Sequence, residues 1–276
     1  MDHADERYLA AKRTVDDRAL DRRVRDRLLD ELPAAPRVLE AGCGTGVTVP
    51  RLVDWGVTAG AYRGVDRNRA VVEAARESRA AELDAEPVEG GFRVDDLTVR
   101  FEAGDALNAF GDERADLVVA QAFLDLVPVE AALDAFAAAL GPDGLVYAPI
   151  TFDGETIFQP AHPSDDAVVA AYHAAIDDAP GRDSRAGRHL LDHCRERAGE
   201  LLAAAASDWV VHPRNGGYPA DERHFLDTIL SFVADAVDGT VPEADAWLRT
   251  RRRQLAAGTL TYVAHGYDVL YRPESR

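Results

Sequence analysis

The sequence predicts an α/β fold built on a mostly parallel sheet of seven strands, with helices on both faces. Over the first half of the chain, short apolar runs alternate with segments of helical periodicity, an order typical of parallel strands joined by right-handed crossovers. These runs lie at residues 37–41, 62–66, 99–102, 116–120 and 144–150. Two later apolar runs, at 208–211 and 260–270, bring the expected number of strands to seven.

Segments outside this alternation are predicted to be mainly helical. Apolar residues recur at helical spacing over residues 4–32, which predicts a helical N-terminal cap over 1–35 in front of a main domain over 36–276. A further helix is expected at 188–206. Residues 212–258 predict a helical insertion before the last strand, which would form a lid over a bound substrate.

The composition restricts the class of protein. The formal net charge is −18, and Lys12 is the only lysine among 31 basic residues. Such an acidic, lysine-poor surface resembles that of proteins from salt-loving organisms and argues against a nucleic-acid partner. Without a long apolar stretch or zinc-like ligand spacing, we expect a cytoplasmic protein with no membrane partner and no metal, as a monomer or a homodimer.

A glycine-rich turn follows the first predicted strand. Gly42, Gly44 and Gly46 allow a ligand to approach the backbone where a Cβ would clash. The third glycine comes one residue too early for the dinucleotide-binding pattern, whose spacing places a pyrophosphate at a helix N-terminus. Glu40 immediately precedes the turn, so the segment suits a ligand carrying an ammonium and a sulfonium better than one with two phosphates.

This segment resembles motif I of the class I (Rossmann-like) S-adenosylmethionine-dependent methyltransferases of small-molecule type. Further motifs of that family match in order at Asp66, at Gly104-Asp105-Ala106, at 116–123 and at 140–145. The resemblance implies that S-adenosylmethionine is the cofactor. It also implies that a methyl group passes to a small-molecule acceptor by in-line displacement.

The resemblance assigns roles to individual residues. Asp66 is expected to accept hydrogen bonds from both ribose hydroxyls, Asp105 from the adenine amino group, and Ala106 to donate its amide to the ring. Asp105 alone could also be a helix cap, and Cys43 is expected to be a packed, unreactive thiol. The full set expected to bind the cofactor is Glu40, Gly42, Cys43, Gly44, Gly46, Asp66, Arg67, Asp105, Ala106, Gln121 and Phe123.

The acceptor side of the site is less defined by the sequence. Asp125 is the acid nearest to the expected methyl group, so it is either the catalytic base or a loop or capping carboxylate. Phe123 could stack on adenine, wall the acceptor pocket or belong to the core. Residues expected to contact the substrate are Phe152, Asp153 and Glu155, after the fifth strand, and Tyr218, in the insertion.

Two questions remain open at this level. Tyr8, Lys12 and Arg13 either face the cofactor site from the N-terminal helix or lie on a solvated face of it. The alternatives to a small-molecule methyltransferase are a non-catalytic S-adenosylmethionine-binding regulatory protein, an RNA methyltransferase and an NAD-dependent oxidoreductase. Gln121-Ala122-Phe123-Leu124 differs from the motif of enzymes that methylate nucleic-acid amino groups, which disfavours that activity.

Overall fold

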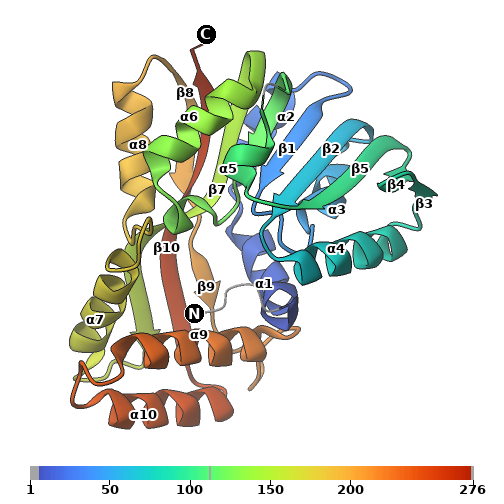
Figure 1. Cartoon of the computed structure of the whole chain (residues 1–276). Helices are drawn as coiled ribbons and strands as arrows, with labels where there is room; N and C mark the ends of the chain where they lie inside the picture. The colour runs from blue at the N-terminus through green and yellow to red at the C-terminus, as the bar shows by residue number, and fades with distance from the viewer. Residues whose placement is uncertain (1–5, 112, 275–276) are drawn as a thin grey trace.

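One twisted sheet organises the chain in the computed structural model, which describes residues 6–111 and 113–274 (Figure 1). Its strand order is β3-β4-β5-β2-β1-β6-β7-β10-β8, and β9 pairs with part of β10. The strands are β1 (Arg37–Ala41), β2 (Ala59–Asp66), β3 (Glu86–Val88), β4 (Gly91–Val94), β5 (Asp96–Ala103), β6 (Ala115–Val119), β7 (Leu140–Gln159), β8 (Gly199–Ala206), β9 (Trp209–Val211) and β10 (Thr261–Pro273). The neighbours β5, β2, β1, β6 and β7 are parallel, so the predicted mostly parallel α/β fold is confirmed.

Helices cover both faces of this sheet, as predicted. One apolar core lies under α2 (Arg22–Glu31), α3 (Thr48–Asp54) and α4 (Arg69–Glu82), and another lies under α5 (Ala106–Ala109), α6 (Val129–Ala139) and α8 (Ala186–Glu196). The central strands β1 and β6 are buried along almost their whole length, which explains why they read as continuous apolar runs.

The described residues contain ten strands, three more than expected. The hairpin of β3 and β4 extends the β5 edge. The helix predicted at 188–206 is wrong in its second half, because α8 ends at Glu196 and β8 begins at Gly199. The segment Leu201–Ala206 is rich in helix-forming residues, but pairing along β10 overrides this local preference.

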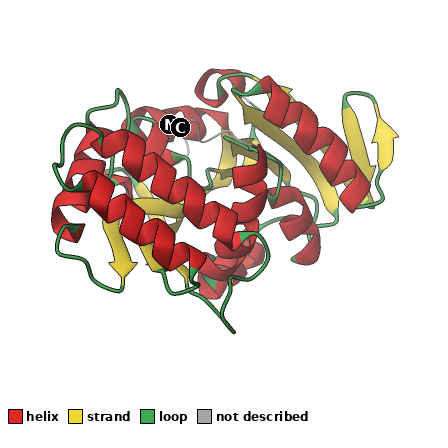
Figure 2. Ribbon diagram, turned by 90° about the horizontal axis from the view of Figure 1, so that it is seen from below, coloured by secondary structure: helices red, strands yellow, loops and turns green. Residues whose placement is uncertain are grey.

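A third apolar core lies beyond the Rossmann-like part of the sheet. It is formed by α1 (Glu6–Ala19), α7 (Asp165–Asp177), α9 (Glu222–Val237) and α10 (Ala244–Ala256), packed against β7, β9 and β10. Figures 1 and 2 show α9 and α10 across this end of the sheet. The helices α9 and α10 fall within the predicted insertion, whereas residues 1–5 of the predicted N-terminal cap lie outside the described residues.

The N-terminal helical pattern forms two helices with separate contacts. Asp21 lies between the two helices and caps α2 by accepting hydrogen bonds from the amides of Arg23 and Val24. As a result α1 packs on α9 and β9, while α2 packs on β8 and β10. No helix among residues 6–111 and 113–274 has the length and apolar composition needed to cross a membrane.

Asp268, in β10, links three segments of the chain: β10 itself, Asp21 at the start of α2 and Ile150 in the middle of β7. Its fully buried carboxylate accepts hydrogen bonds from the amide of Asp21 at 2.7 Å and from the amide of Ile150 at 2.9 Å. Ile150 has a φ of 56°, at an irregularity in β7. Burial raises the pKa of Asp268 to about 6, although these hydrogen bonds favour the charged form.

We expect Asp268→Ala to lower the free energy of unfolding by about 2–4 kcal/mol, because two buried amides lose their acceptor. Urea unfolding followed by circular dichroism would measure the change. The control is Asp235→Ala, at an exposed position on α9, for which a change within about 0.5 kcal/mol is expected. Equal stability of the two variants would contradict the role given to Asp268.

Candidate active site

A cavity of about 430 Å³ opens at the carboxyl ends of the parallel strands, next to the point where the strand order reverses between β1 and β6. This is where open α/β sheets bind ligands, and the volume suits a small molecule. It is lined by most of the residues expected to bind a cofactor, namely Glu40, Gly42, Cys43, Gly44, Asp66, Arg67, Asp105, Ala106, Gln121 and Phe123.

The glycine turn after β1 forms one wall of the cavity. Gly42 has a φ of 69°, and a Cβ there would lie 2.6 Å from Cδ2 of Phe123. The amides of Gly42 and Cys43 both donate to the carbonyl of Val65, at 2.9 and 3.2 Å, which ties the turn to β2. Gly46 does not line the cavity: a Cβ at this position would lie 2.5 Å from Cζ of Phe101, so this glycine allows close packing against β5.

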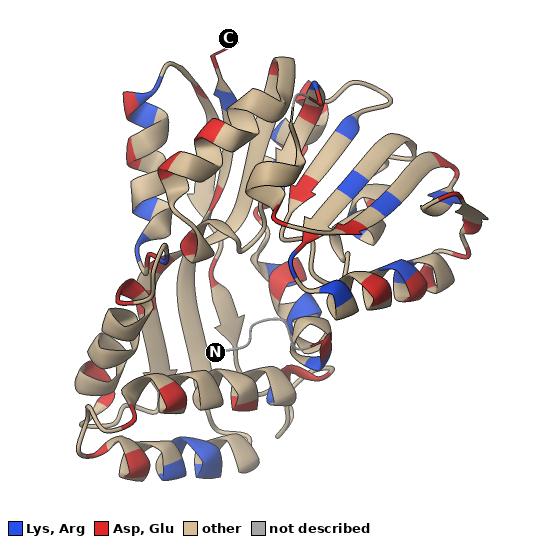
Figure 3. Cartoon of the chain, in the orientation of Figure 1, with Lys and Arg blue, Asp and Glu red and all other residues tan. Residues whose placement is uncertain are grey.

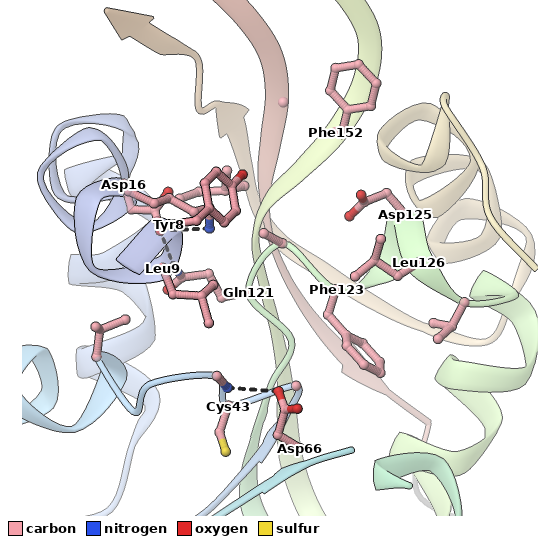
Figure 4. Close-up of a pocket in the computed structure, with 18 of the residues that line it drawn as sticks. Tyr8, Leu9, Asp16, Cys43, Asp66, Gln121, Phe123, Asp125, Leu126 and Phe152 are labelled. Atoms are coloured by element: carbon pink, nitrogen blue, oxygen red, sulfur yellow. Dashed lines mark hydrogen bonds and ion pairs between the residues drawn. The ribbon is translucent and has the colours of Figure 1, made fainter. Parts of the chain in front are cut away.

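Asp66 ends β2 with its carboxylate at the cavity wall. One oxygen accepts from the amide of Gly44 at 3.0 Å and the other from the amide of Asn68 at 2.9 Å (Figure 4). A carboxylate has about four acceptor positions, so two further hydrogen bonds can form. This arrangement fits a ligand with two adjacent hydroxyl groups.

Asp105 follows β5 and has two roles. It caps α5 by accepting from the amide of Leu107 at 3.2 Å, and it forms an ion pair with Arg67 at 2.8 Å on the cavity rim. Although burial opposes it, the hydrogen bonds from Arg67 and Leu107 hold the pKa of Asp105 below its usual range. The capping role is therefore present, and the residue also lines the cavity.

Glu40, just before the turn, and Cys43, within it, are both buried. Glu40 accepts hydrogen bonds from the hydroxyl of Thr48 at 2.7 Å and from the hydroxyl of Tyr62. Burial raises the pKa of Glu40 to about 7, despite these donors. Burial also raises the pKa of the Cys43 thiol well above its usual value, so the thiol stays protonated and is a poor nucleophile.

Asp125, in the short 3-10 helix η1 (Leu124–Leu126), is half-buried and lines the cavity. Its Oδ1 is buried and has no hydrogen-bond partner among the described residues. Burial raises the pKa of Asp125 to about 6, against the opposing positive charges of Lys12 and Arg182. A carboxylate with a raised pKa at a cavity wall is a candidate ligand-binding or catalytic group.

The N-terminal helix closes the opposite side of the cavity. Tyr8 and Lys12 line it, whereas Arg13 forms an ion pair with Glu82 at 2.7 Å. The buried carboxylate of Asp16 receives three hydrogen bonds at 2.9 Å, from Lys12, Gln121 and Trp209 (Figure 4).

Sequence reasoning missed Asp16 and Trp209. The spacing of four residues between Lys12 and Asp16 on one helix was an available signal for their ion pair. Asp16 and Trp209 are 193 positions apart in the sequence, and no local sequence pattern indicated that they would be in contact.

The residues expected to contact the substrate are only partly brought together. Phe152 lines the cavity, but residues 151–156 form part of β7, where a loop was expected. Because successive side chains of a strand point to opposite faces, Asp153 faces α8 and forms a two-point ion pair with Arg188. Neither Glu155 nor Tyr218 lines the cavity. The hydroxyl of Tyr218 donates a hydrogen bond to the carbonyl of Leu260 at 2.8 Å.

The donor set of the site contains no arrangement typical of a metal centre. Within the part of the chain that the structure describes, no group of three or more histidine, cysteine or acidic side chains could hold a metal ion.

Comparison with known proteins connects this geometry to a family. A family model described as "Methyltransferase domain" matches residues 9–151, more than half of the chain. A search of the curated proteins found no match.

Several solved structures are similar to the chain. They include the YcgJ protein from Bacillus subtilis, with a TM-score of 0.51, 18% identity and coverage of 90% of this chain and 97% of that one. An S-adenosyl-L-homocysteine complex of a SAM-dependent methyltransferase from Geobacter sulfurreducens has a TM-score of 0.50 and 18% identity, and covers 93% and 92%. The MccD protein has a TM-score of 0.50 and 15% identity, and covers 92% and 97%. At these identities, the likenesses show the fold.

We expect Asp16→Asn to lower the free energy of unfolding by about 3 kcal/mol, because the buried ammonium of Lys12 loses its ion-pair partner. Hydrogen exchange should also become faster at the amides of α1. Asp26→Asn is the control, since Asp26 forms an exposed ion pair with Arg25. An α1 that exchanges equally in both variants would show that Asp16 does not hold this helix.

Proposed function

Because the chain belongs to the methyltransferase domain family, we propose that it transfers a methyl group from S-adenosylmethionine to a small-molecule acceptor by in-line displacement. The observation that carries this proposal is the division of one cavity into two ends. Cys43 of the glycine turn and Asp66 lie at one end, and Asp125 lies beyond them (Figure 4). Asp105 also lines the cavity.

The first end fits the parts of S-adenosylmethionine. Gly42 and Gly44 both line the cavity and carry no side chain, so their backbone would be accessible to the amino-acid tail. Asp66 would hold the ribose hydroxyls, and Asp105 with the amide of Ala106 would hold the adenine. When bound, the cofactor supplies an electrophilic methyl group on a sulfonium.

Asp125 is proposed as the general base. The Asp125 carboxylate lines the cavity and can take a proton from the acceptor, and its raised pKa makes it a stronger base than an exposed aspartate. A base at this position supports a catalyst rather than a non-catalytic binding protein. The glycine spacing disfavours NAD, and the net charge of −18 with acidic and basic side chains interspersed disfavours RNA (Figure 3).

We expect Asp66→Ala to weaken S-adenosylhomocysteine binding by about 100-fold or more, because two charge-assisted hydrogen bonds to the ribose are lost. Calorimetry in molar KCl would measure the dissociation constants. Asp54→Ala, at an exposed position of α3, should bind normally. Unchanged binding by Asp66→Ala, or preferential binding of NADH by the unmodified protein, would refute the proposed site.

We expect Asp125→Asn to be more stable than the unmodified protein above pH 6 by about 2–3 kcal/mol, with a difference that vanishes near pH 4. The folded pKa of about 6 lies above the usual value of 3.8, so between these values the folded state binds the proton more tightly. Stability therefore falls as pH rises through this window and stays reduced above it. Urea unfolding of both proteins at pH 4.5 and 8 tests this, and a difference independent of pH would contradict it.

A further inference from the structure

The end of the cavity beyond Asp125 has walls of a different kind. Six apolar or aromatic side chains surround it, contributed by five elements that are distant in sequence. They are Tyr8 of α1, Phe152 of β7, Tyr172 of α7, Ile229 and Phe232 of α9, and Tyr262 of β10. In Figure 4, Phe152 lies on one side of Asp125, and Phe123 and Asp66 lie on the other.

These walls are held in place by their own packing. Tyr8 stacks on Phe225 with ring centres 5.7 Å apart and meets the edge of Phe232 at 5.3 Å. Tyr8, Tyr172 and Tyr262 are all buried. A rigid, aromatic-lined space favours a flat apolar ligand and penalises a ligand that carries a permanent charge.

The charged groups around this end nearly balance one another. Lys12 and Arg182 both stabilise the charged form of Asp125, Asp183 opposes them to a smaller extent, and Lys12 is itself ion-paired with Asp16 at 2.9 Å. Selection against a charged acceptor therefore rests on the apolar walls, because an ammonium ion that enters this end loses its hydration without a full set of new partners.

We propose that the methyl acceptor is an uncharged, ring-containing apolar molecule whose phenol-type hydroxyl hydrogen-bonds to the carboxylate of Asp125; this inference rests on the proposed function. The hydroxyl proton passes to Asp125. The hydroxyl oxygen forms the new C–O bond as the C–S bond of the cofactor breaks, and the products are a methyl ether and S-adenosylhomocysteine. The proton leaves Asp125 for solvent when the products depart.

Three naphthalene probes of similar shape test the chemistry of the acceptor. They are 2-naphthol, 2-(aminomethyl)naphthalene and 6-hydroxynaphthalene-2-sulfonate, each titrated by calorimetry into protein saturated with S-adenosylhomocysteine. We expect 2-naphthol to bind at least about tenfold more tightly than either charged probe. With S-adenosylmethionine, mass spectrometry should detect 2-methoxynaphthalene. Equal or tighter binding of a charged probe, or no binding of 2-naphthol, overturns the inference.

A pair of matched variants locates the binding site. Phe152→Leu should weaken 2-naphthol binding by about two- to tenfold, because an aromatic contact is lost. Phe92→Leu is the control, since Phe92 of β4 packs against Phe101 outside the cavity. Both variants should bind S-adenosylhomocysteine normally. A protein that binds neither compound refutes the proposed function itself, whereas normal cofactor binding with equal 2-naphthol affinity in both variants overturns only the acceptor assignment.

Discussion

The antiparallel pairing of β7 with β10 is the constraint on which the rest of the structure depends. It runs from Tyr271 opposite Val146 to Thr261 opposite Gln159, well past the point where the parallel strands end. Two strands that extend this far would expose an apolar face, which α1, α7, α9 and α10 cover. The space between this covering layer and the ends of the parallel strands is the cavity, so the same pairing that extends the sheet also creates the acceptor end.

Two buried carboxylates at this cavity have opposite hydrogen-bonding states. Asp16 has three donors and joins α1, β9 and the loop after β6 into one wall. Asp125 keeps one oxygen without a donor, and its burial raises its pKa to about 6. Burial of the Asp125 carboxylate without a full set of hydrogen bonds lowers the free energy of unfolding, and the surrounding packing offsets this loss. The satisfied carboxylate is therefore structural, and the unsatisfied one marks where a ligand proton is expected.

The sequence could predict that the residues proposed to bind the cofactor lie together, because they stand at the ends of successive strands. The position of Asp66 followed from a strand and an acid about 20 residues after the glycine turn, information that is local and ordered along the chain. The acceptor end could not be predicted in the same way. Asp153 was expected at the rim because residues 151–156 read as a loop, but pairing with β10 extends the strand and turns this side chain toward Arg188. Contacts such as Trp209 with Asp16 depend on tertiary structure alone.

The two ends of the cavity also differ in how freely their sequences can vary. At the cofactor end, a turn with positive φ at Gly42 and Gly44 leaves few alternatives, because any Cβ at Gly42 meets Phe123. At the acceptor end, six side chains from five elements form the wall, and each can change in size while its helix or strand keeps its place. A change of acceptor would therefore be expected to involve substitutions in these five elements but none in the glycine turn. Because the matched family segment covers residues 9–151, all six side chains of this wall lie outside it, with Tyr8 before it and Phe152 and the others after it.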